Sequence, residues 1–187
     1  KYLKAAFASI PYFKLSDMAV NQIKYNELAD QDLIILNDIR SITSGLINEI
    51  KQYVENGGNV LIFPAANGDK NTYNNLLASL RSSQIQEYTT TKKEVKTINT
   101  NEFVFEGVFE SRQANNLRLP VSSGQYQLSA FQNSPRTSLL KYRDGNDYLI
   151  KNQLSNIYSR YGKNNLICDE SYIIWIYISF ILLLIII

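Results

Sequence analysis

Hydrophobic and polar positions along residues 32–63 change from a strand-like to a helix-like spacing and back. Leu33–Leu36 is a short continuous apolar run, typical of a buried strand, and Val60–Phe63 is a second. Gly57 and Gly58 predict the end of an intervening helix, because glycine adopts positive φ without steric cost. The apolar stripe of that helix is formed by Leu46, Ile47, Ile50, Tyr53 and Val54. Two buried strands joined by a helix predict a parallel βαβ unit.

The pattern after Phe63 predicts one more helix and then a β-rich region. Tyr73, Leu76, Leu77 and Leu80 lie at helical spacing after a polar loop, and Asn71 or Thr72 is the expected cap. From about residue 83, β-branched and aromatic residues predict strands that either extend the parallel sheet or form a subdomain on it. These strands are Ile85–Thr91, Glu94–Ile98, Phe103–Phe109, Leu117–Val121, Tyr126–Phe131, and a hairpin of Ser138–Tyr142 with Asp147–Ile150 around Asp144-Gly145. A short helix ended by Pro11 is expected at the start of the chain.

The end of the chain is an uncharged apolar run, Tyr172–Ile187. As a helix it would span about 24 Å, which is short of a hydrocarbon core of roughly 30 Å. Three interpretations stay open: a transmembrane helix that is cut off, a complete short anchor, or an aberrant end such as a shifted reading frame. We therefore expect an α/β domain over residues 1–165 and an apolar tail over residues 166–187. Because the first residue is Lys1, we expect the sequence to be a fragment.

Composition excludes several classes of chemistry. The chain has no histidine and a single cysteine, so Ser-His-Asp and Cys-His constellations, internal disulfides and thiolate metal clusters are excluded within it. The formal net charge is +2 over 187 residues, and Lys92-Lys93 is the only adjacent basic pair. Nucleic-acid surfaces usually carry a basic stripe, so we expect no nucleic-acid partner. We also expect no cofactor and no metal.

Taken in order, these motifs resemble the class I glutamine amidotransferase-like domain of BatA-type (aerotolerance-related), membrane-anchored proteins of Bacteroidetes. The residues that carry the resemblance are Asp32–Asn37, Ser44-Gly45-Leu46 and Tyr53–Pro64, with Tyr73-Asn74, Leu76-Leu77, Val104–Glu110 and Leu119-Pro120 behind them. It covers roughly residues 1–150. It implies a flavodoxin-like parallel sheet with flanking helices and a β-rich C-terminal half, in a protein that carries transmembrane helices elsewhere.

The same resemblance implies a scaffold without amidotransferase activity. True amidotransferases place a nucleophilic cysteine on a strand-to-helix elbow and a histidine later in the chain. Here Pro64-Ala65-Ala66-Asn67 follows the second strand, and histidine is absent. We therefore expect no catalytic residues and no enzyme activity.

Candidate ligand-binding residues come from the expected carboxyl ends of the two parallel strands, where doubly wound folds bind ligands. They are Asn37, Asp38, Ser41, Asn67, Asp69 and, opening the next helix, Asn74. The simpler alternative is that Asn37 and Asp38 only turn the chain and cap the helix, as these residue types commonly do. Asp38 and Asp69 could also form a carboxylate pair, although nothing in their spacing requires it. Tyr53 and Tyr73 are expected to pack on the core.

The sequence thus favours a non-catalytic interaction domain of a membrane-associated envelope protein. It would bind a protein partner in the envelope, lie in the periplasm as a soluble domain, and meet the membrane through the C-terminal tail or flanking helices. The alternative is a small-molecule-binding or hydrolytic domain that acts at the strand-end crevice through Asp38, Asn67 and Asp69.

Overall fold

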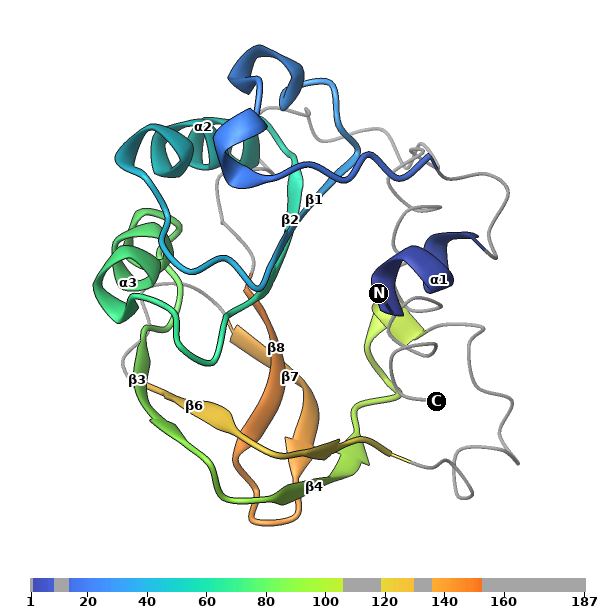
Figure 1. The fold of residues 1–187 in the computed structure, drawn as a ribbon. Coiled ribbons are helices and arrows are strands. Elements are labelled where there is room, and N and C mark those ends of the chain that lie inside the picture. Colours follow the sequence, from blue (N-terminus) through green and yellow to red (C-terminus); the bar gives the residue numbers. More distant parts are fainter. Residues whose placement is uncertain (1, 9–13, 106–118, 130–135, 153–187) are drawn as a thin grey trace.

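A parallel pair of strands, covered on one face by two helices, forms the upper part of the molecule (Figure 1). In this computed structural model, which describes residues 2–8, 14–105, 119–129 and 136–152, β1 (Leu33–Asn37) pairs with β2 (Asn59–Phe63). The crossover helix is α2 (Ser44–Glu55), and α3 (Lys70–Ser79) follows β2. The predicted βαβ unit is therefore confirmed, with Leu33 opposite Asn59 and Asn37 opposite Phe63.

Local chemistry at both ends of α2 explains its bounds. The Thr43 hydroxyl accepts a hydrogen bond from the Leu46 N–H at 3.3 Å, which satisfies one of the free donors of the first turn. At the other end, Gly57 has φ +100° and Gly58 donates its N–H to the Tyr53 carbonyl at 2.9 Å. The Gly57 N–H bonds to the Val54 carbonyl at 3.0 Å, so the two glycines complete a Schellman motif.

The chain beyond α3 forms antiparallel sheets. One has two strands, β3 (Ile85–Thr89) and β6 (Gln125–Leu128). The other has the order β5-β4-β7-β8, with bounds Val121–Ser122, Lys93–Ile98, Arg136–Tyr142 and Asp147–Asn152. Together they curl into a half-barrel below the parallel pair (Figure 1). The hairpin predicted around Asp144-Gly145 is confirmed as β7–β8, and Gly145 has φ +85°.

The flavodoxin-like parallel sheet predicted from the resemblance is wrong. Only β1 and β2 pair in parallel, and every other strand pair in the described ranges is antiparallel. A parallel partner needs a crossover of about a dozen residues, usually a helix. The β7–β8 pair has a link of only residues 143–146, which is too short for a crossover, and the more distant pairs, β3 with β6 and β4 with β7, also run antiparallel. The βαβ unit predicts a larger parallel sheet, but the second half of the chain adds no parallel strand to it within the described ranges.

Several smaller predictions have mixed outcomes. Phe103–Phe105 is a 3-10 helix and not a strand. Further short helices are α1 (Tyr2–Ala8) and the 3-10 turns Val20–Gln22 and Tyr25–Glu27. Several predictions concern residues outside the described ranges. They are the strand residues 106–109 and 117–118, Pro11, the domain boundary at residue 165 and the apolar tail from residue 172. Among the helices of the described ranges, none has the length and apolarity to cross a membrane.

Two hydrophobic cores meet at the parallel pair. Ile34 and Leu36 of β1 pack with the buried faces of α2 and α3. Leu33, whose side chain alternates to the other side, packs on the second core, which is built mainly from β4 and β7. The members of the second core are Val95, Val104, Phe105, Leu139, Leu140 and Tyr142. The short strand β1 therefore contributes side chains to both cores.

Replacing Gly58 by alanine tests the close approach at the end of α2. An added Cβ would lie 2.3 Å from Tyr53 Cε1, and the Tyr53 hydroxyl is held by a 2.8 Å hydrogen bond to the Gln31 carbonyl. Because this ring is buried and tethered, we expect Gly58→Ala to lower the free energy of unfolding by about 1–3 kcal/mol. Urea unfolding measures this change. Gln52→Ala, at an exposed position of the same helix, should change it by less than about 0.5 kcal/mol, and an equally stable Gly58→Ala variant would contradict the packing.

Candidate functional site

The two loops after β1 and β2 lie side by side, as the parallel pairing requires. The Asp38 N–H donates to the Phe63 carbonyl at 3.0 Å, and the Asp69 N–H donates to the Arg40 carbonyl at 2.7 Å. Asp38 has φ +55°, a left-handed conformation that aspartate tolerates better than most residues. The structure therefore brings the candidate residues of both strand ends into one region, with the side chains of Asn37, Asp38, Ser41 and Asn67 exposed.

Tyr73, from the first turn of α3, occupies the space between these loops. Its side chain is 0% exposed. Its hydroxyl donates to the Ile39 carbonyl at 2.5 Å and accepts from the Ala65 N–H at 3.3 Å. Burial raises the pKa of the Tyr73 hydroxyl, and the Ala65 N–H opposes that shift. The expectation that Tyr73 packs on the core is confirmed, and its hydroxyl also fastens the two loops to each other.

A second tyrosine, on β6, also bonds to the loop after β2. Tyr126, on β6, donates its hydroxyl to the Ala65 carbonyl at 2.7 Å. Gly68 completes the arrangement, because a Cβ at this position would lie 2.7 Å from Tyr73 Cε2. Ala65, itself only 2% exposed, is therefore bonded through its N–H to one tyrosine and through its carbonyl to another.

Two of the six candidate residues already have structural roles. The Asp69 carboxylate caps α3 by accepting from the Asn71 N–H at 3.0 Å, so the prediction that Asn71 or Thr72 provides this cap is wrong. The Asn74 amide donates to the Ile85 carbonyl and accepts from the Ile85 N–H, both at 2.9 Å. The Asn74 amide therefore joins α3 to β3 by bonding to both backbone groups of Ile85, as the backbone of a paired strand would.

The chemistry open to the strand ends is therefore limited. Tyr73 is buried between the two loops, Asn37, Asp38, Ser41 and Asn67 are exposed, and the Asp69 carboxylate is engaged with the backbone. No group of three Asp, Glu, Cys or His side chains that could hold a metal ion occurs within the part of the chain that the structure describes. The arrangement holds loops in place and presents polar side chains at its surface.

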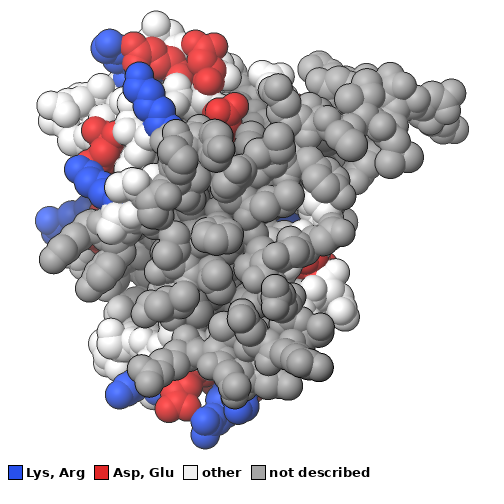
Figure 2. Space-filling model, turned by 90° about the vertical axis from the view of Figure 1, so that its right-hand side faces the viewer, with Lys and Arg blue, Asp and Glu red and all other residues white. Residues whose placement is uncertain are grey.

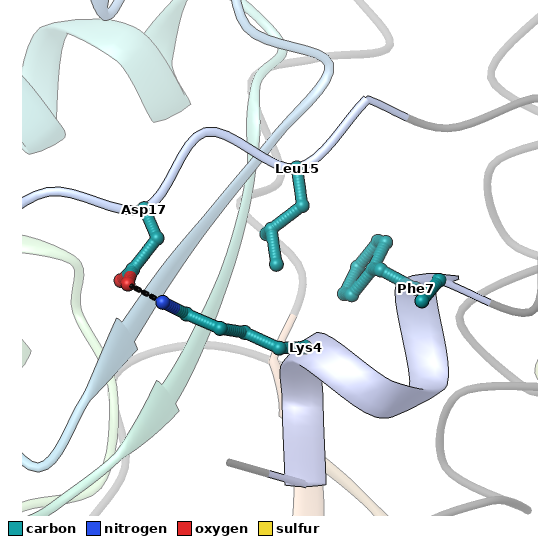
Figure 3. A pocket seen from close by; sticks show the side chains of 5 residues that line it. Lys4, Phe7, Leu15 and Asp17 are labelled. Atoms are coloured by element: carbon teal, nitrogen blue, oxygen red, sulfur yellow. Dashed lines mark ion pairs between the residues drawn. The ribbon is translucent and has the colours of Figure 1, made fainter.

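A hollow near the N-terminus has an ion pair across its mouth. Lys4 and Asp17 approach to 2.6 Å beside the apolar side chains of Phe7 and Leu15 (Figure 3). The hydrogen bond from Lys4 lowers the pKa of the Asp17 carboxyl. Both charged side chains are exposed, so this pair adds little to stability and leaves mainly an apolar wall within the hollow.

A second hollow, of about 470 Å³, lies where the start of β4 meets the β7–β8 turn. We name it the charged hollow, and its lining consists of Lys92, Lys93, Glu94, Tyr142, Arg143 and Asp144. The sequence shows Lys92-Lys93 and Asp144-Gly145 as separate motifs, and no local pattern indicates that they meet in the fold. The hydrogen bond from Lys93, followed by the Asn146 N–H, lowers the pKa of the Asp144 carboxyl.

Removal of one hydroxyl tests the role of Tyr73. In Tyr73→Phe the buried Ala65 N–H and the Ile39 carbonyl lose a partner, so we expect the free energy of unfolding to fall by about 1–3 kcal/mol. The matched control is Tyr25→Phe, which removes an exposed hydroxyl bonded to Thr43 and should cost less than about 0.5 kcal/mol. Urea unfolding of both variants makes the comparison, and equal losses would show that the Tyr73 hydroxyl has no special role.

Alkaline pH tests the burial of the tyrosines. Burial raises the pKa of Tyr53, Tyr73, Tyr142 and Tyr148 above the ordinary value of 10.0, so the folded state holds these protons more tightly than the unfolded chain does. Their contribution to stability is therefore complete below about pH 10 and is lost as the pH rises through the folded-state pKa values. The free energy of unfolding, measured in urea against pH, should fall above pH 10, and less steeply in Tyr73→Phe. A rise in that range would contradict the burial.

Comparisons with protein-family models, curated proteins and solved structures find no match to this chain. The resemblance to amidotransferase-like domains therefore stays a prediction from the motifs. What the chain does must be argued from its own geometry.

Proposed function

We propose that this chain is a non-catalytic interaction domain of a membrane-associated envelope protein, and that it works by contact with a protein partner. The observation that carries the proposal is the buried Tyr73 side chain, which fills the strand-end region where a ligand would otherwise bind. A ligand that entered between the loops would have to displace this ring. Displacement would leave the Ala65 N–H without its bond, at a cost of about 1–3 kcal/mol.

The roles of the other polar groups support the same conclusion. Asp69 and Asn74, which looked like ligand-binding residues, hold α3 and β3 through backbone hydrogen bonds. The membrane part of the proposal has a separate support, the uncharged run Tyr172–Ile187. The non-catalytic role and the envelope location in this proposal are those that the motif resemblance implies. The flavodoxin-like fold that it also implies is not part of the proposal.

Photo-crosslinking in cells of the source organism tests the proposal. A photoreactive residue is placed at one exposed position of each face: Lys51 on α2, Asn67 at the strand ends, Gln86 on β3 and Val121 on β5. We expect at least one position to give a discrete adduct with a protein of the envelope fraction, whereas the other faces do not. This pattern would identify a contact surface rather than random collision.

The competing function, ligand binding at the strand ends, predicts a different result. Native mass spectrometry of the gently purified protein would then detect a small molecule at one-to-one stoichiometry, and Asp38→Ala or Asn67→Ala would abolish its retention. That result, together with no protein adduct from any of the four positions, would overturn the interaction proposal.

A further inference from the structure

The charged hollow combines an unusual set of side chains at one end of the half-barrel. Figure 1 shows the β7–β8 turn next to the start of β4 at the lower end of the molecule, and Figure 2 shows basic and acidic side chains mixed at that end. Its rim carries three cations and two carboxylates, which leaves one net positive charge. Its volume, about 470 Å³, is within the range of about 300–1,000 Å³ typical of ligand sites.

One ion pair of the hollow is fixed in place. Lys93 Nζ lies 2.6 Å from Asp144 Oδ2 and 5.6 Å from the centroid of the Tyr142 ring, which attracts the cation through its face. Asp144 also accepts the Asn146 N–H at 3.0 Å, and Tyr142 is buried and packs edge-on against Tyr148. Lys93, Asp144 and Tyr142 therefore form the rigid wall and floor of the hollow.

The other cations of the rim are free to exchange partners. The Arg143–Glu94 pair, at 2.8 Å, is on the surface, with 70% of the arginine side chain and 54% of the glutamate side chain exposed. Such exposed pairs contribute little to stability, so another carboxylate can replace Glu94 on Arg143 at little cost. Within the described ranges, Lys92 has no ion pair at all. Two cations beside the rigid wall are therefore available to an incoming anionic group.

We propose that the charged hollow binds an extended acidic segment of a partner protein, whose carboxylates bond to Lys92 and Arg143. Val121, 49% exposed and paired in register with Glu94, offers an apolar contact beside these charges. This inference rests on the proposed function and names the kind of partner. A nucleic acid fits less well, because it presents a continuous line of phosphates and the single net positive charge of the hollow neutralises few of them.

Fluorescence anisotropy with defined probes tests the inference on the full chain. The probe is a fluorescent peptide of alternating glutamate and alanine, and the comparison probes are an alternating lysine and alanine peptide and a single-stranded oligonucleotide of equal length. We expect binding of the acidic peptide alone, and weaker binding as salt is added, because exposed charge pairs are screened. Lys92→Ala and Arg143→Ala should each weaken this binding about three- to tenfold, the effect expected for loss of one charge-assisted contact.

Two further variants separate binding from a structural or merely electrostatic effect. Glu94→Gln removes the carboxylate that competes for Arg143, so it should strengthen binding of the acidic peptide. Lys51→Ala, which removes one exposed positive charge on α2, should leave binding unchanged. Wild-type affinity in both Lys92→Ala and Arg143→Ala, weaker binding in Glu94→Gln, or tighter binding of the oligonucleotide would each overturn the assignment. If the peptide fails to bind while photo-crosslinking finds an envelope protein at another face, only the assignment to this hollow falls and the interaction function stands.

Discussion

The arrangement of this molecule depends most on the two hydrogen bonds of the Tyr73 hydroxyl. This hydroxyl lies between the loops that follow the two parallel strands and bonds to one backbone group in each, the Ile39 carbonyl and the Ala65 N–H. Through Ala65 it is linked to Tyr126 and so to the antiparallel half. Because a buried N–H without a partner is costly, the chain gains from keeping this ring in place. The same ring that joins the two loops therefore lies at the end of the parallel pair, where a parallel sheet would bind a ligand.

This arrangement separates the stable part of the protein from the part that is suited to recognition. Two of the polar side chains at the strand ends, Asp69 and Asn74, are engaged with backbone atoms and hold α3 and β3 in place. At the lower end of the molecule in Figure 1, the charged hollow presents exposed cations on a wall made by Lys93, Asp144 and Tyr142. A partner that binds there need not disturb either hydrophobic core.

The sequence predicted the features that short-range signals determine. The βαβ unit and the Asp144-Gly145 hairpin were both recoverable, since glycine conformation and apolar spacing decide them locally. The sheet order was not, because pairing of β4 with β7 and of β3 with β6 depends on contacts between distant segments. For the site, the sequence placed Asn37, Asp38, Ser41 and Asn67 at the strand ends. It could not show that Asp69 and Asn74 bond to backbone, or that the hydroxyl of a tyrosine in an apolar stripe joins two loops.

The central claim is that the Tyr73 hydroxyl bonds to Ala65 and holds the strand-end region closed. Native-state hydrogen exchange at the Ala65 amide, followed by NMR in the wild-type protein and in Tyr73→Phe, tests it directly. We expect the Ala65 amide to be as protected as those of β2 in the wild type, with protection lost selectively at Ala65 when the hydroxyl is removed. Exchange at the rate of an exposed loop in the wild type, or protection unchanged in the variant, would contradict it.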